Sequence, residues 1–387
     1  MIPLSVMVTG KGTVSRRIKG RSVRNGFTSE LRPVVFWNMT YKCNLKCIHC
    51  YIGAGPDVDK PELPLDAKLD IADQMVKQEI PLVVFTGGEP LASPDFWRVV
   101  EHLQGYKRPK LSLSTNGTLI TSRVAERLRD LGLQYVGISI DSINPETHDW
   151  FRGLKGAFKA AIKGVENSVA AGIPTGLRMT ITKWNIGEAL DLLDLAGELG
   201  VERISYYMLD TVGRGSALLE ALPGRREVAW FIDSLIEAAR RYEGKMEILL
   251  VRLNQAGIYL ADKLARSREE FHRLLDIVEG QGDCGRKTVS IYPDGTVRPC
   301  QFIDYIIVGD LKRESLASIL STENPRLKPF LEPWRNLKGP MCSGCPFKRV
   351  CGGGSRNRAL RATGDLWGDD PACFLDVKSI AERWGLL

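Results

Sequence analysis

The chain lacks any apolar run long enough to cross a membrane. No stretch of its 387 residues approaches about 18 consecutive apolar residues, the length that a membrane-spanning helix requires. It also lacks the layout of a secretory signal, because the apolar start MIPLSVMV precedes the basic residues instead of following them. With 44% hydrophobic and 26% charged residues, it is neither disordered nor of low complexity. We therefore expect a cytoplasmic globular protein of two or three domains.

Cysteine is absent from residues 51–283, and this gap divides the nine cysteines into two groups. Cys43, Cys47 and Cys50 form the first group, and the second lies between Cys284 and Cys373. An odd number of cysteines in a cytoplasmic chain argues against a disulfide framework, because thiols are kept reduced there. Two separated groups of thiols indicate metal sites in two domains.

The net charge of +7 is mild, and part of it is local. Residues 1–32 hold seven Lys or Arg residues against one acid, Glu30. We interpret this stretch as a basic, solvated N-terminal arm, with a surface for an anionic substrate or partner as the alternative. No nucleic-acid partner is expected, because no basic stripe interleaved with aromatic residues is present.

Between residues 33 and 212, short apolar runs alternate with amphipathic stretches of helix length. Six runs have the character of buried parallel strands: 34–39, 82–86, 111–115, 135–141, 176–182 and 203–210. A helical pattern follows each of the first five. These α/β units predict a partial TIM-type (β/α)6 barrel that is open on one side. In such sheets the chemistry gathers at the C-terminal ends of the strands.

The alternation stops after residue 212. We interpret residues 213–280 as a helical bridge and 281–387 as a second domain rich in Cys, Gly and Pro. Such a segment buries little apolar surface, so metal ligation is the natural means of holding it together. Residues 288–300 predict a β-hairpin with its turn at 293–295.

The first cysteine group has the spacing Cys-x3-Cys-x2-Cys, just beyond the first predicted strand. Three thiolates on one loop can ligate three irons of a [4Fe–4S] cluster and leave the fourth iron open. A zinc site of three cysteines and His49 is the alternative. The motif resembles the signature of the radical S-adenosylmethionine superfamily. The resemblance implies that S-adenosylmethionine chelates the open iron of a cluster on Cys43, Cys47 and Cys50.

Elements at the other predicted strand ends resemble the same superfamily, among them Gly-Gly-Glu-Pro after the second strand and Asn-Gly after the third. Taken alone, both would equally be turns. The resemblance assigns the binding of S-adenosylmethionine to His49, Gly87, Gly88, Glu89, Asn116, Ser139, Arg178 and Leu209. It places His49 beside the adenine and the Gly-Gly-Glu element at the methionine amino group. Tyr207 and Met208 are the candidates for a catalytic role, and Met208 stands where related enzymes often carry a histidine.

The C-terminal cysteines resemble the SPASM extension of that superfamily. Four of them, Cys342, Cys345, Cys351 and Cys373, suffice for one auxiliary [4Fe–4S] cluster, with a zinc ribbon as the alternative. Cys284 and Cys300 are candidates for a second auxiliary cluster, but two thiolates alone cannot hold a cubane. Ser355 occupies the place of a further cysteine of the SPASM pattern, and we favour the absence of the second cluster.

Three long stretches are similar to a tetrapyrrole-modifying branch of SPASM enzymes: residues 33–51, 176–216 and 342–373. The resemblance implies removal of acetate side chains from 12,18-didecarboxysiroheme, giving iron-coproporphyrin III through a 5′-deoxyadenosyl radical. The alternatives are haem synthase-type oxidative decarboxylation of propionates and a SPASM peptide maturase. An iron–sulfur carrier is disfavoured, because it needs no adenosyl pocket.

The implied partners are an anionic tetrapyrrole and a low-potential electron donor such as ferredoxin or flavodoxin. Arginine can bind carboxylates as a bidentate fork. The candidates for holding the carboxylates of the tetrapyrrole are Arg214, Arg286, Arg298, Arg356, Arg358 and Arg361.

Overall fold

A computed structural model describes residues 1–10, 32–279 and 284–386 of the chain. The strands of this part form one sheet, in the order β1-β8-β7-β6-β5-β4-β3-β2-β9-β10-β11. Their bounds are β1 Ile2–Pro3, β2 Val34–Asn38, β3 Leu82–Thr86, β4 Lys110–Thr115, β5 Tyr135–Ser139, β6 Thr175–Ile181, β7 Arg203–Met208, β8 Glu247–Val251, β9 Thr288–Ile291, β10 Thr296–Arg298 and β11 Gly309–Asp310. Neighbouring strands from β2 to β8 are parallel.

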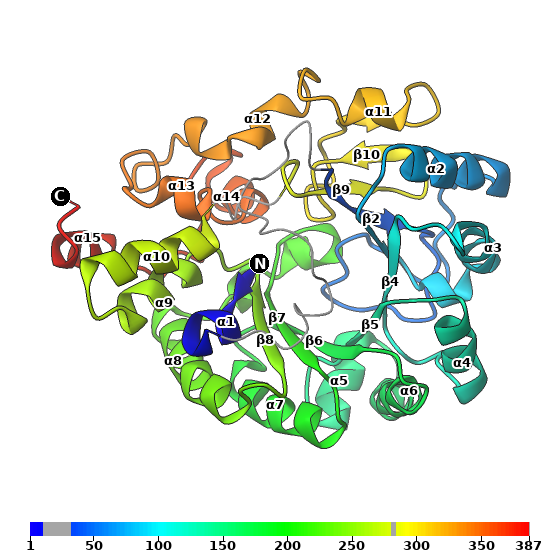
Figure 1. Cartoon of the computed structure of the whole chain (residues 1–387), viewed down its shortest axis with the longest axis horizontal. Coiled ribbons are helices and arrows are strands. Elements are labelled where there is room, and N and C mark those ends of the chain that lie inside the picture. The colour runs from blue at the N-terminus through cyan, green and yellow to red at the C-terminus, as the bar shows by residue number, and fades with distance from the viewer. Residues whose placement is uncertain (11–31, 280–283, 387) are drawn as a thin grey trace.

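Figure 1 shows these strands curving around an open centre, with helices on the outside of the curve. The helices that alternate with the strands are α2 Leu65–Lys77, α3 Pro94–Leu103, α4 Ser122–Asp130, α5 Pro145–Arg152, α6 Ala157–Ala170 and α7 Ala189–Glu198. The partial barrel and its six predicted strands are therefore confirmed. Helix α5 is an addition, because the sequence pattern indicated only one helix between β5 and β6.

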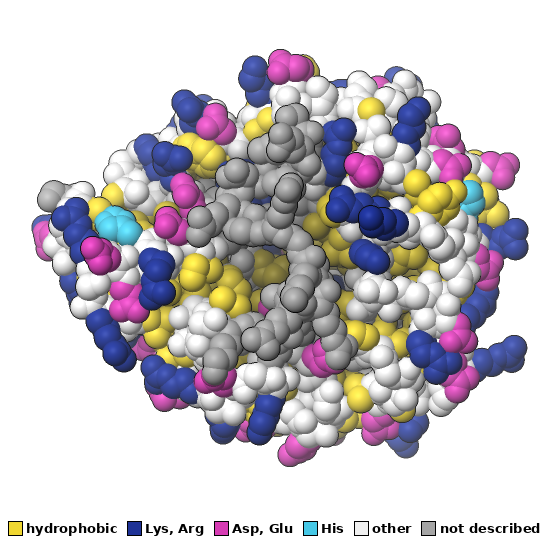
Figure 2. All heavy atoms as spheres, viewed as in Figure 1, with side chains coloured by type: hydrophobic (Ala, Val, Ile, Leu, Met, Phe, Trp, Pro, Cys, Tyr) yellow, Lys and Arg dark blue, Asp and Glu magenta, His cyan; other side chains and the backbone are white. Residues whose placement is uncertain are grey.

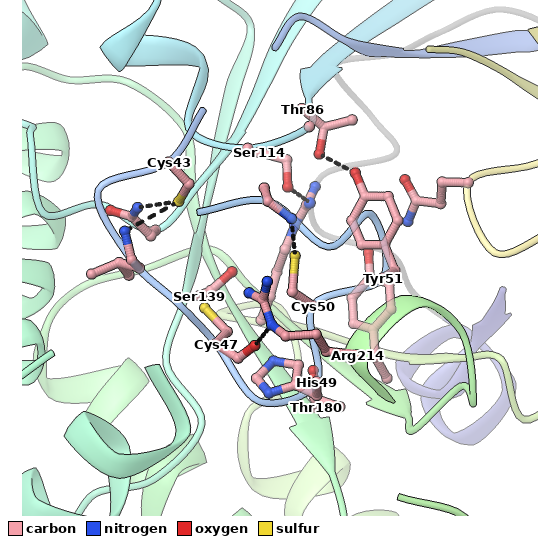
Figure 3. A pocket seen from close by; sticks show the side chains of 18 of the residues that line it. Cys43, Cys47, His49, Cys50, Tyr51, Thr86, Ser114, Ser139, Thr180 and Arg214 are labelled. Carbon is pink, nitrogen blue, oxygen red and sulfur yellow. Dashed lines mark hydrogen bonds between the residues drawn. The ribbon is translucent and has the colours of Figure 1, made fainter. Parts of the chain in front are cut away.

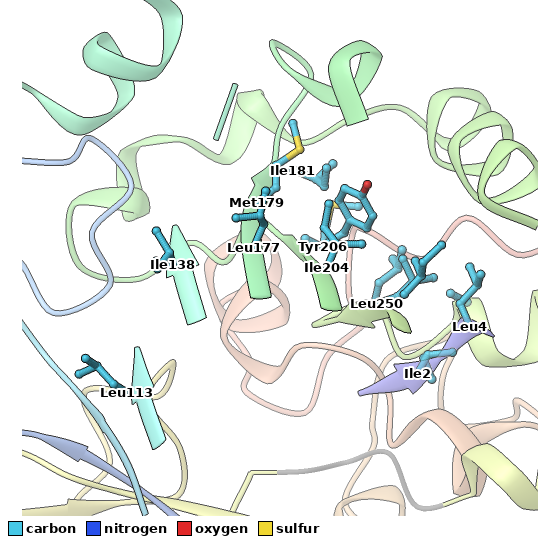
Figure 4. Packing of buried hydrophobic residues seen from close by; sticks show 14 of the residues in the cluster. Ile2, Leu4, Leu113, Ile138, Leu177, Met179, Ile181, Ile204, Tyr206 and Leu250 are labelled. Carbon is cyan, nitrogen blue, oxygen red and sulfur yellow. The ribbon is translucent and has the colours of Figure 1, made fainter. Parts of the chain in front are cut away.

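The pleat of the strands separates a packing face from a polar face. Alternate residues of β4 to β8 point toward the helices and form the apolar cluster of Figure 4, among them Leu113, Ile138, Leu177, Met179 and Tyr206. Because successive side chains of a strand point to opposite faces, the residues between them face the inside of the barrel. Inner positions such as Ser114, Ser139, Arg178 and Tyr207 line the cavity described below.

The N-terminal residues differ from the predicted solvated arm. Strand β1 pairs antiparallel with β8, with Ile2 opposite Leu250. Helix α1 (Leu4–Thr9) follows directly, and Ile2 and Leu4 are buried in the same cluster as the barrel core. Residues 1–10 are thus an edge of the barrel, whereas the basic residues of 11–31 lie outside the described residues. An apolar run of two residues is too short to predict a strand.

The expected helical bridge contains a strand as well as helices. Helices α8 (Arg225–Arg241), α9 (Ala256–Leu264) and α10 (Arg268–Val278) fill most of it, but β8 lies between α8 and α9 and extends the parallel sheet. The bridge is therefore partly a seventh unit of the barrel.

The C-terminal domain is joined to the barrel through the sheet. Strand β9 pairs in parallel with β2, and β9 and β10 form the predicted hairpin. The helices that follow are short: α11 Leu316–Ile319, α12 Lys328–Leu331, α13 Lys348–Cys351, α14 Arg356–Thr363 and α15 Val377–Arg383. Among the described residues, no helix has the length and apolar character needed to cross a membrane.

We expect Leu4→Ala to lower the free energy of unfolding by about 2–4 kcal/mol, because Leu4 is fully buried between α1 and the barrel. Ile277→Ala, at a side chain that is 42% exposed, is the control and should change it by less than about 1 kcal/mol. Denaturant unfolding measures both. Equal values for the two variants would show that the N-terminal residues do not pack on the barrel in solution.

Candidate functional site

The cysteine loop of residues 43–50 begins after β2 and lies at the C-terminal ends of the parallel strands. Cys43, Cys47, Cys50 and His49 line a cavity of about 160 Å³, shown in Figure 3. Residues at the strand ends line it too: Thr86, Gly87, Gly88, Ser114, Thr115, Asn116, Ser139, Arg178, Thr180, Tyr207, Met208 and Leu209. The structure thus brings together the residues expected to bind the first cluster and its ligand, with the exception of Glu89.

Each sulfur of the loop has a hydrogen-bond donor. The pairs are Leu45 N–H to Cys43 Sγ at 3.4 Å, Ala54 N–H to Cys50 Sγ at 3.3 Å, and Arg152 Nη1 to Cys47 Sγ at 3.8 Å. Burial raises the pKa of Cys43 to about 12 and also raises the pKa of Cys47. Iron ligation needs the thiolate form, which these donors favour.

The Gly-Gly-Glu segment after β3 contacts the chain just ahead of the cysteine loop. The Gly88 N–H donates to the Thr40 carbonyl at 2.8 Å, and the Glu89 N–H donates to the Lys42 carbonyl at 2.9 Å. A Cβ atom at Gly88 would lie 2.0 Å from the Lys42 carbonyl oxygen. Glycine is therefore required there for the close approach of two backbones.

The Glu89 carboxylate does not line the cavity and holds the turn after β4. It is fully buried and accepts hydrogen bonds from Thr115 Oγ1 at 2.8 Å, the Asn116 N–H at 2.9 Å and the Leu91 N–H at 3.1 Å. Burial raises the pKa of Glu89 to about 7, against the effect of these donors. The structure therefore gives Glu89 a positioning role, and Gly87 and Gly88 face the cavity in its place.

Two further expected residues are held in the cavity by their neighbours. Asn116 Nδ2 donates to Asn44 Oδ1 in the cysteine loop at 2.9 Å. The Arg178 guanidinium donates to Ser114 Oγ and passes over Gly137, where a Cβ atom would lie 2.3 Å from Arg178 Nε. The small residue on β5 therefore makes room for the arginine of β6.

Asp141, just beyond β5, is the charged centre on one side of the loop. Its carboxylate lies 2.7 Å from Arg152 Nη2 and 3.4 Å from His49 Nε2, and it accepts from the Thr180 N–H at 2.9 Å. Burial alone would raise the pKa of Asp141, but Arg152 and His49 outweigh it and lower the pKa. Burial lowers the pKa of His49 to about 4. A neutral His49 beside an ionised Asp141 is the resulting charge state near neutral pH.

The four cysteines expected to hold the auxiliary cluster come together in the C-terminal domain. Cys342, Cys345, Cys351 and Cys373 line a second cavity of about 40 Å³. Burial raises the pKa of Cys351 to about 12 and also raises those of the other three thiols. In the described part of the chain, no three His, Cys, Asp or Glu side chains have the spacing to share one metal ion. A cubane does not need that spacing, because each cysteine binds a different iron.

Comparison with known proteins matches both halves of this arrangement. Residues 37–196 match the model of the radical SAM superfamily, and residues 283–346 match that of the SPASM iron-sulfur cluster-binding domain. The chain is 35% identical to the Fe-coproporphyrin III synthase of Methanosarcina barkeri, over 92% of this chain and 90% of that one. The chain belongs to the radical SAM superfamily. It uses S-adenosylmethionine and iron–sulfur clusters.

Other similar proteins agree with this assignment. The radical SAM chain is 34% identical to the pre-heme d1 synthase of Dinoroseobacter shibae, over 89% of this chain and 86% of that one. Relatives at lower identity include AdoMet-dependent heme synthases and mycofactocin maturases. The solved structure of native anSMEcpe with bound AdoMet shares the fold, with a TM-score of 0.68 at 18% identity over 92% of this chain and all of that one.

The larger cavity of this radical SAM enzyme suits a polar cofactor. His49 Nδ1 and Arg214 Nη2 are buried there without a hydrogen-bond partner among the described residues. Unpaired buried donors and acceptors are costly, so these atoms are suited to a ligand that pairs with them. The three sulfurs and the glycine backbone complete a site that fits the first cluster and S-adenosylmethionine.

Cys284 and Cys300, the candidates for a second auxiliary cluster, lie next to each other. The structure joins them in a disulfide, with their Cα atoms 4.8 Å apart. The argument against disulfides therefore does not hold for this pair, which the β9–β10 hairpin brings together across a separation of 16 residues. Cysteine counting could not show this, because the pairing depends on the hairpin.

Ser355, at the place of the missing cysteine, has a structural role instead. It is buried, and its hydroxyl accepts from the Arg358 N–H at the start of α14 and donates to Asp210 at 3.0 Å. Arg252 donates to Ser355 Oγ at 2.7 Å and to Asp210 at 2.6 Å. At this position the structure thus has the N-terminal cap of α14, formed by Ser355, beside the ion pair of Arg252 and Asp210.

The residue that sequence reasoning missed most clearly is Arg152. It is the last residue of α5 and reaches both Cys47 Sγ and Asp141. No motif marks a single arginine in such a helix, and its role depends on a contact that only the folded chain makes. The ring of Tyr51 was missed too, although its hydroxyl donates to Asn38 Oδ1 at 2.6 Å beside the loop.

We expect protonation of His148 to lower the stability of the folded protein as the pH falls below about 6.5. Its Nδ1 accepts from the Asp141 N–H at 3.1 Å, and burial lowers its pKa to about 4, so the folded state needs the neutral ring. The stability that His148 contributes is complete above its ordinary pKa and is lost as the pH falls toward about 4. Relative to His148→Gln, the wild type should lose about 2 kcal/mol of unfolding free energy between pH 7 and 5.

Denaturant unfolding at the two pH values measures this difference. The exposed His272, replaced by Gln, is the control and should follow the wild type at both values. A constant difference between the wild type and His148→Gln would mean that the ring is not held neutral.

Iron analysis tests the number of clusters. With Cys284 bonded to Cys300, we expect about eight irons per chain after anaerobic reconstitution, four in each of two clusters. Cys284→Ser/Cys300→Ser should bind the same amount, and Cys342→Ser/Cys345→Ser should bind about four. A wild-type value of about twelve that falls to about eight in the first variant would show a second auxiliary cluster.

Proposed function

We propose that this radical SAM enzyme removes acetate side chains from 12,18-didecarboxysiroheme to give iron-coproporphyrin III. The observation that carries the proposal is the 35% identity to an Fe-coproporphyrin III synthase over 92% of the chain. When bound, the cluster and S-adenosylmethionine supply a 5′-deoxyadenosyl radical. The chain's own residues bind and orient the substrate and exclude water. We also propose a cytoplasmic location.

The cavity has an apolar side formed jointly by the two domains. Gln301 and Phe302, from the C-terminal domain, line it together with Met208 and Leu209 from the end of β7. The Phe302 ring lies 5.6 Å from the Tyr51 ring and 4.9 Å from the Arg252 guanidinium. This placement supports a binding position for a flat macrocycle between the strand ends and Phe302.

The two catalytic candidates differ in what they can do. Met208 is 2% exposed, and its thioether is only a weak acceptor that carries no ionisable proton. Tyr207 lines the same cavity and carries a hydroxyl, with the Arg178 guanidinium 6.0 Å from its ring. We therefore propose that the Tyr207 hydroxyl hydrogen-bonds the substrate at this strand end and that Met208 packs against it.

The structure separates the candidate carboxylate-binding arginines. Arg214 lines the cavity and has a free Nη2. Arg358 instead pairs with Asp370 at 2.8 Å, both fully buried, and Arg356 donates to backbone carbonyls such as Gly368 at 2.8 Å. Arg356 and Arg358 therefore have partners within the C-terminal domain, and we leave them out of the proposed carboxylate-binding set. Arg298 lies over the Tyr292 ring at 4.1 Å and stays a candidate.

The exposed surface also suits an anionic macrocycle. Figure 2 shows hydrophobic side chains on both sides of the residues drawn in grey, and a group of Lys and Arg side chains beside them. Apolar side chains can bury the rings of the substrate, and basic side chains can pair with the carboxylates at its periphery.

The test is anaerobic. The reconstituted enzyme is reduced with dithionite and given S-adenosylmethionine and 12,18-didecarboxysiroheme, and 5′-deoxyadenosine and pigment masses are followed by chromatography. We expect 5′-deoxyadenosine together with the stepwise loss of two acetate side chains.

Arg214→Met should raise KM for the pigment at least about ten-fold, because it removes a charge-assisted contact. Arg226→Met, at an exposed arginine, is the control and should leave KM unchanged.

Other outcomes would move the assignment. 5′-Deoxyadenosine with unchanged pigment would contradict the substrate, and assays with iron-coproporphyrin III and with peptides would then test the haem synthase and maturase alternatives. No 5′-deoxyadenosine from protein with full iron content would contradict radical chemistry in this chain.

A further inference from the structure

An exposed aromatic pair lies beside residues that contact the cysteine loop. The Trp150 and Trp184 rings are 5.3 Å apart, edge to face, and are 51% and 42% exposed. Leu154, 43% exposed, follows one turn after Trp150. Large apolar side chains that are exposed together mark interaction sites more often than single ones do. Neither the cavity nor the second cluster uses these three residues.

This surface is one residue away from the contacts of the first cluster. Phe151 packs against His49 at 5.7 Å, and its carbonyl accepts from the Ile48 N–H at 3.0 Å. Arg152, the next residue, reaches Cys47 Sγ at 3.8 Å. Residues 150–152 therefore connect the exposed Trp150 to Cys47, a ligand of the first cluster. Trp150, Leu154 and Trp184 do not line the cavity, which S-adenosylmethionine and substrate would fill.

Three lysines are neighbours of these residues, Lys155 and Lys183 along the chain and Lys46 through the hydrogen bond of its N–H to the Arg152 carbonyl. Lys46, Lys155 and Lys183 are exposed and make no ion pair with any described residue. The nearby Asp149 is already engaged, since its carboxylate accepts from the Gly156 and Phe158 N–H groups, and Glu146 is the exposed acid on the same helix. Aromatic anchors with basic neighbours suit an acidic protein surface.

We propose that this surface, formed by Lys46, Trp150, Leu154, Lys155, Lys183 and Trp184, docks an acidic protein that carries one electron at low potential. The inference rests on the proposed function, which requires a reduced cluster on Cys43, Cys47 and Cys50. The reduced carrier loses one electron and the oxidised cluster gains it, with no bond formed or broken and no proton moved. The carrier would approach the cluster from this surface and would not enter the cavity.

The test compares two reductants on the reconstituted holoenzyme. Reduced flavodoxin, an acidic flavin protein, is mixed with each variant in an anaerobic stopped-flow instrument, and bleaching of the cluster absorbance is followed; dithionite is the small reductant that needs no docking. Lys155→Glu/Lys183→Glu should slow reduction by flavodoxin at least about ten-fold and weaken its dependence on salt. Reduction by dithionite should be unchanged.

Matched controls keep the result specific. Lys77→Glu/Lys107→Glu makes the same change in charge at the opposite end of the barrel, ahead of β3 and β4, and should match the wild type with both reductants. Trp184→Ala, which leaves the charge unchanged, should also slow flavodoxin alone. Less than a three-fold effect of the first variant, or an equal effect of the control pair, would overturn the proposal.

The readout also separates this proposal from the proposed function. Electron transfer is measured without a tetrapyrrole, so a failure to remove acetate groups would contradict the function and leave the docking result standing. Normal acetate removal with dithionite, combined with unaltered reduction by flavodoxin in the first variant, would contradict the docking surface alone.

Discussion

The arrangement of the site depends on backbone hydrogen bonds that fix the cysteine loop from two sides. On one side, the N–H groups of Gly88 and Glu89 donate to the carbonyls of residues 40 and 42. On the other, the N–H groups of Lys46 and Ile48 donate to the carbonyls of Arg152 and Phe151. A loop outside regular structure has no ladder to satisfy its peptide groups, so these contacts determine its shape. The positions of the three sulfurs follow from that shape.

The charges at the site are arranged by the same contacts. The chain that pairs with residues 46–48 also carries Arg152, so fixing the loop brings a buried cation to Cys47 and to Asp141. A buried ion pair adds little net stability, because desolvation offsets the attraction. Its effect here is on charge: the Arg152 cation lowers the pKa of Asp141 and opposes the rise that burial imposes on Cys47. A negatively charged ligand set is thereby favoured where iron binds.

Periodicity was enough to predict the barrel, because buried parallel strands and amphipathic helices have distinct patterns that repeat over 180 residues. Periodicity failed for β1, which has only two residues, and for β8, a short strand between two long helical patterns. The cysteines that motif spacing grouped together line the same two cavities in the structure. Spacing could not show that Glu89 binds the turn after β4 or that Arg152 reaches Cys47, because both depend on how separate segments pack. The pairing of Cys284 with Cys300 could not be predicted for the same reason, because it depends on how the β9–β10 hairpin folds.

The two cluster regions are connected through one buried polar network. Asp210, the residue after Leu209 of the cavity, contacts Arg252 and Ser355, and Ser355 N–H in turn donates to Asp370 at 2.7 Å. Asp370 pairs with the buried Arg358, whose guanidinium also donates to the Leu209 carbonyl at 3.0 Å. Because each charge in the network is satisfied only by its partners, loss of one leaves another buried and uncompensated, at a cost of about 3–5 kcal/mol. Moving one member of the network away from its partners is therefore costly. The end of β7 and the start of α14 are therefore linked by buried charges, which connect the cavity to the C-terminal domain.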